Sequence, residues 1–331
     1  DAVTLAKMAP GTDGNVISYD ASGNPVAVAT GNSGQVLTSA GAGAPPTFAD
    51  AGGGVTFKEG GTNFTRSLLV GADSTGTLSS STDNTGLGTN VFSALTSGTS
   101  NSVVGSFALC SNTTGEDNSV VGKNALCTNT SGTANVAMGK NSLYANTSGG
   151  QNTAVGNASL DSNTTGACNT AIGYLSGSSI TTGTRNVSVG WKALCDLSTS
   201  DANTAIGREA LSKTTNGNNV GIGAEAGAAN TTGQIVAIGS GALQAHTTGG
   251  YNTAIGTESQ RRTTTGSDNV SIGKNALCSL TIGTENIAIG NVALDAQVDG
   301  DQNVAIGHGA LGKATNDKNT AVGRTALDNI T

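Results

Sequence analysis

Five cysteines are the most reactive side chains of this 331-residue chain. Cys110, Cys127, Cys195 and Cys278 each directly follow a leucine, whereas Cys168 stands elsewhere in the sequence. Cys110 and Cys127 are separated by one full period of the repeat described below. Stacking with that period brings their Cα atoms to about 5 Å, a separation that permits a disulfide. The alternative is that cysteine serves here as a small buried apolar residue.

A second group of chemically informative residues directly follows recurring glycines. This position is variable and often long. Tyr174, Trp191 and Arg208 occupy it in three consecutive repeats, so stacking would produce an aromatic–aromatic–cation column. Such a column can bind sugar rings. The column is therefore a candidate surface glycan contact, and the alternative is a column that covers the coil edge or packs between subunits. The position is held by Lys123, Lys140, Tyr174, Trp191, Arg208, Lys274, His308 and Arg324.

Catalytic chemistry has few residues to use. His246 and His308 fall in different repeats, with no partnered cysteine or carboxylate set. Acidic residues near the turns, such as Asp117 and Glu285, recur at most once per repeat, whereas glycoside hydrolysis needs a converging carboxylate pair. The nonapeptide of calcium-binding solenoids is absent. We predict no catalytic residue, no metal and no cofactor, and therefore no enzyme.

The composition excludes several other classes of protein. Glycine makes up 50 of the 331 residues, about twice the usual share. Charged residues make up 11%, against roughly 25% in ordinary soluble domains. The net charge of −7 with only 15 lysines and arginines argues against nucleic-acid binding. No apolar run approaches the ~20 residues of a membrane-spanning helix, so we expect no membrane insertion.

A short sequence repeat determines the expected architecture. From Asn84 onward, 15 units of sixteen or seventeen positions each carry a strand-like run that ends in glycine. Because so short a unit cannot bury a core alone, each must be one coil stacked on its neighbours. We predict an all-β parallel β-solenoid of about 15 coils, on the order of 70 Å long. The repeated residues include Asn101, Asn118, Asn135, Asn152, Asn169, Asn186 and Asn203, and Gly105, Gly122, Gly139, Gly156, Gly173, Gly190 and Gly207.

Each repeated residue has a predicted structural role. The asparagines are expected to stack as an amide ladder and to hydrogen-bond the turns. The glycines are expected to turn the chain at positive φ. In the run Asn169–Gly173, we expect Ile172 to point inward with the recurring leucines, and Ala171 to face outward. A face kept that small would admit another subunit closely, most simply in a homotrimer.

The repeat also creates Asn-x-Ser/Thr sequons. Several arise because the turn itself reads Asn-Thr-Thr or Asn-Thr-Ser, so the repeat explains them without glycosylation. They begin at Asn63, Asn112, Asn129, Asn146, Asn157, Asn163, Asn186, Asn230, Asn269 and Asn329.

The N-terminal part of the chain has a different pattern. Two runs, 14–18 and 34–38, are each followed by a turn that contains glycine and proline, which indicates small β-units. A glycine-rich linker at 51–54 follows. We therefore divide the chain into N-terminal β-units and linker (1–54), a β connector (55–83) and the repeat solenoid (84–331).

These motifs resemble a known group of proteins. Repeats of the form Asn-Thr-Ala-Ile-Gly-x-x-Ala-Leu, followed by Thr-Thr-Gly, are similar to those of phage and large-virus tail-fibre or surface-fibre proteins. The strand motif also resembles the head repeats of trimeric autotransporter adhesins, which fold as trimeric β-rolls. The N-terminal runs resemble the short β-units that such fibres carry. The resemblance implies an elongated, oligomeric attachment protein.

We therefore expect an extracellular structural and adhesive fibre on a virion or cell surface. Its partners would be copies of itself, as a homotrimer or end to end, and a host-cell surface glycan or protein. The main alternative is a cellular adhesin or a self-assembling extracellular filament. A third hypothesis, an enzyme that degrades surface polysaccharide, would need acidic residues that converge across subunits.

Overall fold

The computed structural model describes residues 16–28, 35–39, 44, 46–50, 57–59, 63–71, 76–313 and 316–328. Contacts between residues divide the chain into two units, Asp1–Thr56 and Phe57–Thr331. Regular structure in the described residues consists of β-strands, with no helix. The predicted linker at 51–54 lies outside the described residues.

The N-terminal unit contains two antiparallel hairpins. Strand β1 (Val16–Tyr19) pairs with β2 (Pro25–Val28), and β3 (Gln35–Thr38) pairs with β4 (Thr47–Asp50). The β1–β2 turn is closed by the Asp20 carboxylate, which accepts hydrogen bonds from the backbone N–H groups of Ser22 at 2.9 Å and Asn24 at 2.8 Å. Such a side-chain cap is typical of an Asx turn.

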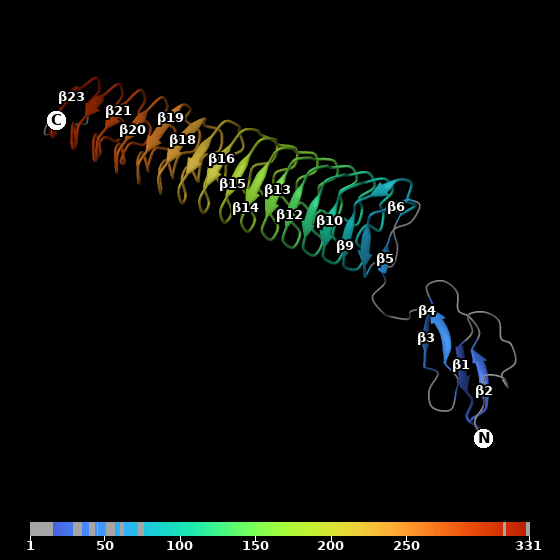
Figure 1. Cartoon of the computed structure of the whole chain (residues 1–331). Helices are drawn as coiled ribbons and strands as arrows, with labels where there is room; N and C mark the ends of the chain where they lie inside the picture. The colour runs from blue at the N-terminus through green and yellow to red at the C-terminus, as the bar shows by residue number, and fades with distance from the viewer. Residues whose placement is uncertain are drawn as a thin grey trace. The chain divides into compact units, whose positions relative to one another are not determined.

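The second unit is a rod of stacked coils (Figure 1). Sixteen short parallel strands form one sheet along it. Strand β5 (Phe57–Glu59) pairs antiparallel with β7 at its N-terminal edge, and β6 (Phe64–Thr65) pairs with β8 (Ser81–Thr82). The parallel strands are β7 (Leu68–Val70), β9 (Thr85–Leu87), β10 (Ser102–Val104), β11 (Ser119–Val121), β12 (Val136–Met138), β13 (Thr153–Val155), β14 (Thr170–Ile172), β15 (Val187–Val189), β16 (Thr204–Ile206), β17 (Val220–Ile222), β18 (Ile235–Ile238), β19 (Asn252–Ile255), β20 (Val270–Ile272), β21 (Ile287–Ile289), β22 (Val304–Ile306) and β23 (Thr320–Val322).

Equivalent residues of successive coils pair in register. Thr153 pairs with Thr170, and Ala154 with Ala171. Backbone bonds between coils continue outside the strands: the Leu126 N–H donates to the Ser142 carbonyl at 2.9 Å. This confirms the predicted parallel β-solenoid, in which each sequence repeat forms one coil. Its sheet begins one strand earlier than predicted, because β7 in the predicted connector pairs in register with β9.

The prediction of which strand face points inward is wrong. The small central residue, such as Ala154 or Ala171, is completely buried, whereas Ile172 is 41% exposed. The core is narrow because the coil's opposite wall supplies leucine. At Gly221, for example, an added Cβ would lie only 2.6 Å from Leu211 Cγ. The interior therefore accommodates glycine, alanine, serine or valine opposite leucine, and the last residue of each strand, such as Ile172, points outward.

The wall that carries the leucines bends through unusual backbone conformations. Leu109, Leu126 and Leu143 all adopt left-handed φ values near 50°, which L-residues seldom do. The strand-end glycines Gly105 and Gly156 have φ of 137°. A Cβ on Gly156 would lie 2.4 Å from the carbonyl oxygen of Gly173 in the next coil. Glycine is required there because adjacent coils approach through their backbones.

The asparagine column is bonded from coil to coil and is interrupted at Ile235, whose backbone N–H donates to Asn219 Oδ1 at 2.9 Å. The Asn101 side-chain amide donates to Asn84 Oδ1 at 3.0 Å and to the carbonyl of Gly115 at 3.0 Å. The backbone N–H of Asn101 donates to the same Asn84 oxygen. Asn101 therefore ties its strand to the coil before it and to the turn that follows, which satisfies polar groups that water cannot reach.

Candidate functional site

The predicted glycan contact lies on the outer surface of consecutive coils. Tyr174 is 49% exposed and Trp191 41% exposed. Their coils are joined by a backbone bond of 3.1 Å from Lys192 N–H to the Tyr174 carbonyl. The next coil is joined by a bond of 2.9 Å from Glu209 N–H to the Trp191 carbonyl. The repeat therefore places the two aromatic residues and Arg208 in neighbouring rungs.

The cation beside the tryptophan is different from the predicted one. Lys192 Nζ lies over the Trp191 ring, 4.8 Å from its centroid. Arg208 instead pairs with Glu209 at 2.7 Å and with Glu225. The side chains are partly solvated, so each ion pair contributes little to stability. Their effect is to fix Arg208 toward the acidic side chains that follow it.

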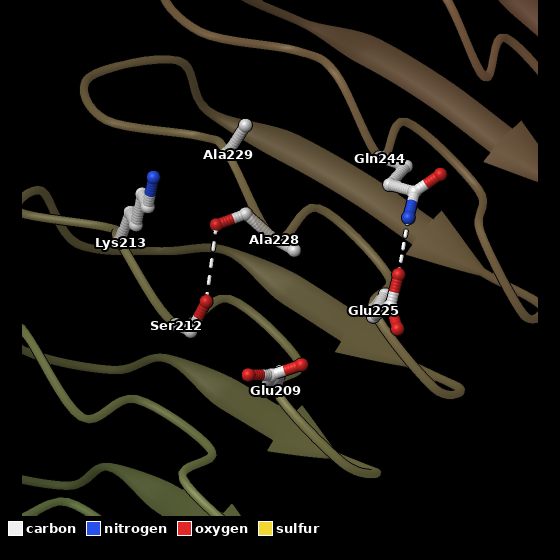
Figure 2. A pocket seen from close by; sticks show the side chains of 7 residues that line it. All are labelled: Glu209, Ser212, Lys213, Glu225, Ala228, Ala229 and Gln244. Atoms are coloured by element: carbon white, nitrogen blue, oxygen red, sulfur yellow. Dashed lines mark hydrogen bonds between the residues drawn. The ribbon is translucent and has the colours of Figure 1, made fainter.

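A polar depression lies beside the Arg208 ion pairs, because their partners Glu209 and Glu225 line it (Figure 2). It has a volume of about 210 Å³ and lies where small residues at positions 228 and 229 leave space between coils. The Gln244 amide donates to Glu225, and Ser212 Oγ donates to the Ala228 carbonyl at 3.2 Å (Figure 2). The residues that line it are Glu209, Ser212, Lys213, Glu225, Ala228, Ala229 and Gln244.

This arrangement combines the two elements of carbohydrate recognition. The exposed aromatic rings offer faces on which a sugar can stack. The neighbouring carboxylates, amide and hydroxyl offer fixed hydrogen-bonding groups. The sequence indicated the aromatic column but missed Lys192 and the depression, because both depend on which side chains meet between coils.

A second surface runs the length of the solenoid on the sheet side. We call the outward side chains of β9–β23 the aliphatic face. Each strand contributes two outward side chains. The first is serine, threonine, valine or isoleucine, and the second is leucine, valine, methionine or isoleucine. None of them is charged. Among the most exposed are Val104, Val121, Met138, Ile172, Ile206, Ile272 and Ile306. These residues were predicted to lie inside the coil, so this surface was not expected from the sequence.

The Cys110 and Cys127 thiols meet between neighbouring coils. Their Sγ atoms are 2.8 Å apart, and Cys110 Sγ also lies 3.3 Å from the Cys127 carbonyl oxygen. A hydrogen bond from Cys127 lowers the pKa of Cys110 to about 6. The same interaction raises the pKa of Cys127 well above its usual value. Both thiols are free and half-buried.

The other cysteines have different neighbours. Cys195 lies 3.5 Å from the Ser212 carbonyl oxygen, and burial together with the Asp196 carboxylate raises its pKa to about 11. Cys278 is near the Asp295 carbonyl, at 3.9 Å. Cys168 is exposed, with its Sγ 3.1 Å from Gln151 Oε1.

His246 is fully buried, a placement that the sequence did not indicate. Its Nδ1 lies 3.2 Å from Asn230 Oδ1, and its Nε2 lies 3.1 Å from Asn252 Nδ2. Burial lowers its pKa to about 4. The ring is neutral at physiological pH and bridges two amides inside the rod, so it serves packing rather than exposed chemistry.

Most of the sequon asparagines are buried inside the rod. Asn112, Asn129, Asn146 and Asn163 form a second internal asparagine column in consecutive coils, and Asn230 holds the same position further along the rod; all five are fully buried. For example, Asn129 Nδ2 donates to Asn112 Oδ1 at 2.9 Å. Asn63 and Asn157 are exposed, whereas Asn329 lies outside the described residues. Recurrence with the period of the first column was the signal that could have identified the second one.

The described residues contain no cluster of three or more histidine, cysteine, aspartate or glutamate side chains positioned to hold a metal ion. Nor do they include a helix with the length and hydrophobicity needed to cross a membrane. Comparisons of the chain with protein-family models, curated proteins and solved structures give no match.

Proposed function

We propose that this chain is the shaft of a structural and adhesive fibre that mediates host attachment, of the type found in viral tail fibres. The observation that carries the proposal is the uninterrupted register of strands β7 and β9–β23. A rod of about 70 Å in which every coil is bonded to the next holds a binding surface at a distance from its anchor. The proposed location is extracellular, on a virion or cell surface.

The chemistry of the interior supports a mechanical role. Backbone bonds join neighbouring coils in the strands and in the turns, and two buried amide columns add further bonds. In such stacked repeats, stability is approximately the sum of the coils and their interfaces. Local opening in the middle breaks bonds on two sides, so the rod resists bending and proteases.

Self-association is the second part of the proposal, and the aliphatic face is where we place it. The face carries two ladders of uncharged side chains along fifteen strands, β9–β23. Its area is about 700 Å², given strands about 4.8 Å apart and two outward residues per strand, close to the ~800 Å² per partner of a stable interface. We propose a homotrimer whose subunits bury this face around a common axis.

Adhesion is assigned to the surface around Trp191 and the neighbouring depression. Stacking on Trp191 and Tyr174, with hydrogen bonds to the depression, fits a host-surface glycan. Single contacts of this size are weak. Several identical shafts on one particle would bind together and gain affinity through avidity.

A cellular adhesin or self-polymerising extracellular filament is the alternative. Strand β5 bears on it, because β5 lies antiparallel against β7 at the N-terminal edge of the sheet. Because β5 covers the edge of β7, the backbone N–H and C=O groups of that edge are not free to pair in parallel with a strand of another chain. This favours a fibre of fixed length over end-to-end growth at that edge.

Electron microscopy tests the proposed fibre directly. We expect negatively stained full-length protein to form straight rods of one length at all concentrations. Gold-labelled antibodies against the chain should decorate the fibres of native particles. Lengths that increase with protein concentration would instead support the filament, and globular particles would overturn both.

A further inference from the structure

Four cysteines share one position in the coil, directly after the core position usually held by leucine. In consecutive coils this position is occupied by Cys110, Cys127 and then Tyr144. Cys195 is flanked by serine in both neighbouring coils, and Cys278 by Arg261 and Asp295. Cys110 and Cys127 are therefore adjacent in the column, with Sγ atoms 2.8 Å apart.

We propose that Cys110 and Cys127 form a redox-active pair that cross-links two neighbouring coils, with a low-molecular-weight disulfide such as glutathione disulfide as the oxidant. The cross-link would join the coil that begins with β10 to the coil that begins with β11. It would close a segment of exactly one repeat, next to the end of the rod where β5 pairs with β7.

The 2.8 Å contact between the sulfurs, together with the lowered pKa of Cys110, indicates different roles for the two thiols. Cys127 donates a hydrogen bond that favours the thiolate of Cys110. A thiolate with a pKa near ambient pH is the most effective attacking group in exchange reactions. Cys110 is therefore the nucleophile and Cys127 the resolving thiol. Cys195 has the opposite environment, since burial and Asp196 favour its protonated form.

The exchange proceeds in two balanced steps. The Cys110 thiolate attacks one sulfur of the small disulfide, forms a mixed disulfide and releases one thiolate. Cys127 then loses its proton, and its sulfur attacks Cys110 Sγ. The second small thiolate leaves. Two protein thiols are oxidised to one disulfide, and one small disulfide is reduced to two thiols.

The consequence is a rod whose resistance to opening depends on redox state. Stacked coils open from their ends or from weak interfaces. A disulfide across a loop of this length restricts the open state enough to reduce its population by about 100-fold. In an oxidising environment the β10–β11 interface would be locked, and a reductant would release it.

Mass spectrometry of the full-length protein tests the proposal. The reduced protein is incubated with glutathione disulfide, and the remaining thiols are then alkylated. We expect two thiols to be lost with no glutathione added to the protein, and peptide mapping to show a Cys110–Cys127 link. Amide hydrogen exchange at β10 and β11 should then slow by up to about 100-fold in the oxidised form.

Two variants distinguish the assigned roles. Cys127→Ala should trap one glutathione on Cys110, because the resolving thiol is gone. Cys195→Ala is the matched control: it removes a cysteine from the same position of another coil and should leave cross-linking unchanged. Free Cys110 and Cys127 after oxidation, separate glutathione adducts on both, or a link to a second chain would overturn the proposal.

Discussion

Single buried residues affect the stability of this rod. The contribution of His246 should depend on pH. Burial lowers its pKa from 6.5 to about 4, so the folded state resists protonation more than the unfolded state does. The stabilisation is complete above pH 6.5 and is lost as the pH falls toward 4. With about 1.4 kcal/mol per pKa unit, the loss is about 3 kcal/mol.

The measurement is denaturant unfolding between pH 7 and pH 4, with hydrogen exchange at β18 and β19 as the local readout. His246→Gln should flatten the profile, since glutamine does not titrate and Gln297 occupies the equivalent position three coils later. His308→Gln, at an exposed histidine, should leave the profile unchanged. A wild-type profile that stays flat across this range would contradict the assignment.

Trp191 is the residue on which the proposed adhesion depends most. Trp191→Ala should weaken binding to host cells or arrayed glycans by about tenfold per site, because aromatic stacking and cation–π contacts contribute roughly 1 kcal/mol or more. Tyr144→Ala is the control, an exposed aromatic residue in a different column of the coil. Equal binding by the wild type and Trp191→Ala would exclude the stacking surface.

At the scale of one coil, backbone contact at the strand-end glycines controls stacking. Gly156→Ala would place a Cβ 2.4 Å from Gly173 O at a φ of 137°. We expect a loss of about 3 kcal/mol or more, since both the contact and the dihedral angle are unfavourable. Faster hydrogen exchange in β13 and β14 would report it.

The same substitution at Gly250 is the matched control for the coil. A Cβ there meets no atom within 4 Å, and its φ lies outside the left-handed region. Gly250→Ala should change the free energy of unfolding by less than about 0.5 kcal/mol. If Gly156→Ala and Gly250→Ala were equally stable, close backbone approach would not be the reason for glycine at this position.

At the scale of the whole molecule, the proposed trimer depends on the aliphatic face. Ile172→Lys combined with Ile206→Lys places charges in the centre of this face, on side chains that are 41% and 39% exposed in the single chain. The fold should survive. The association constant of the trimer should fall at least about 100-fold, because like charges buried at an interface cost several kcal/mol.

Sedimentation and native mass spectrometry measure this change. Thr165→Lys, at an exposed turn residue, should remain trimeric. Trimers for both lysine variants would place the contact elsewhere on the rod. A wild-type protein that is monomeric at micromolar concentration would contradict self-association, and a dimer would retain the face while correcting the stoichiometry.

The sequence alone predicted the solenoid, because the same residue types recur at a regular interval. Asparagine and glycine at a nearly constant interval required equivalent positions to stack, and parallel register follows from a single repeating direction. The same period placed Tyr174 above Trp191 and Cys110 beside Cys127 in neighbouring coils. These inferences depended on spacing, which the sequence states directly.

Tertiary structure decided which side of each strand points inward. Alternation divides Thr170, Ala171 and Ile172 into two faces, but it does not say which is inside when both lack charge. The distance to the leucine wall decides it, since that gap admits a residue no larger than valine, and here it holds Ala171. The cation over Trp191 and the burial of the second asparagine column also depend on which side chains meet in the folded rod. The spacing of residues within one repeat does not specify those contacts.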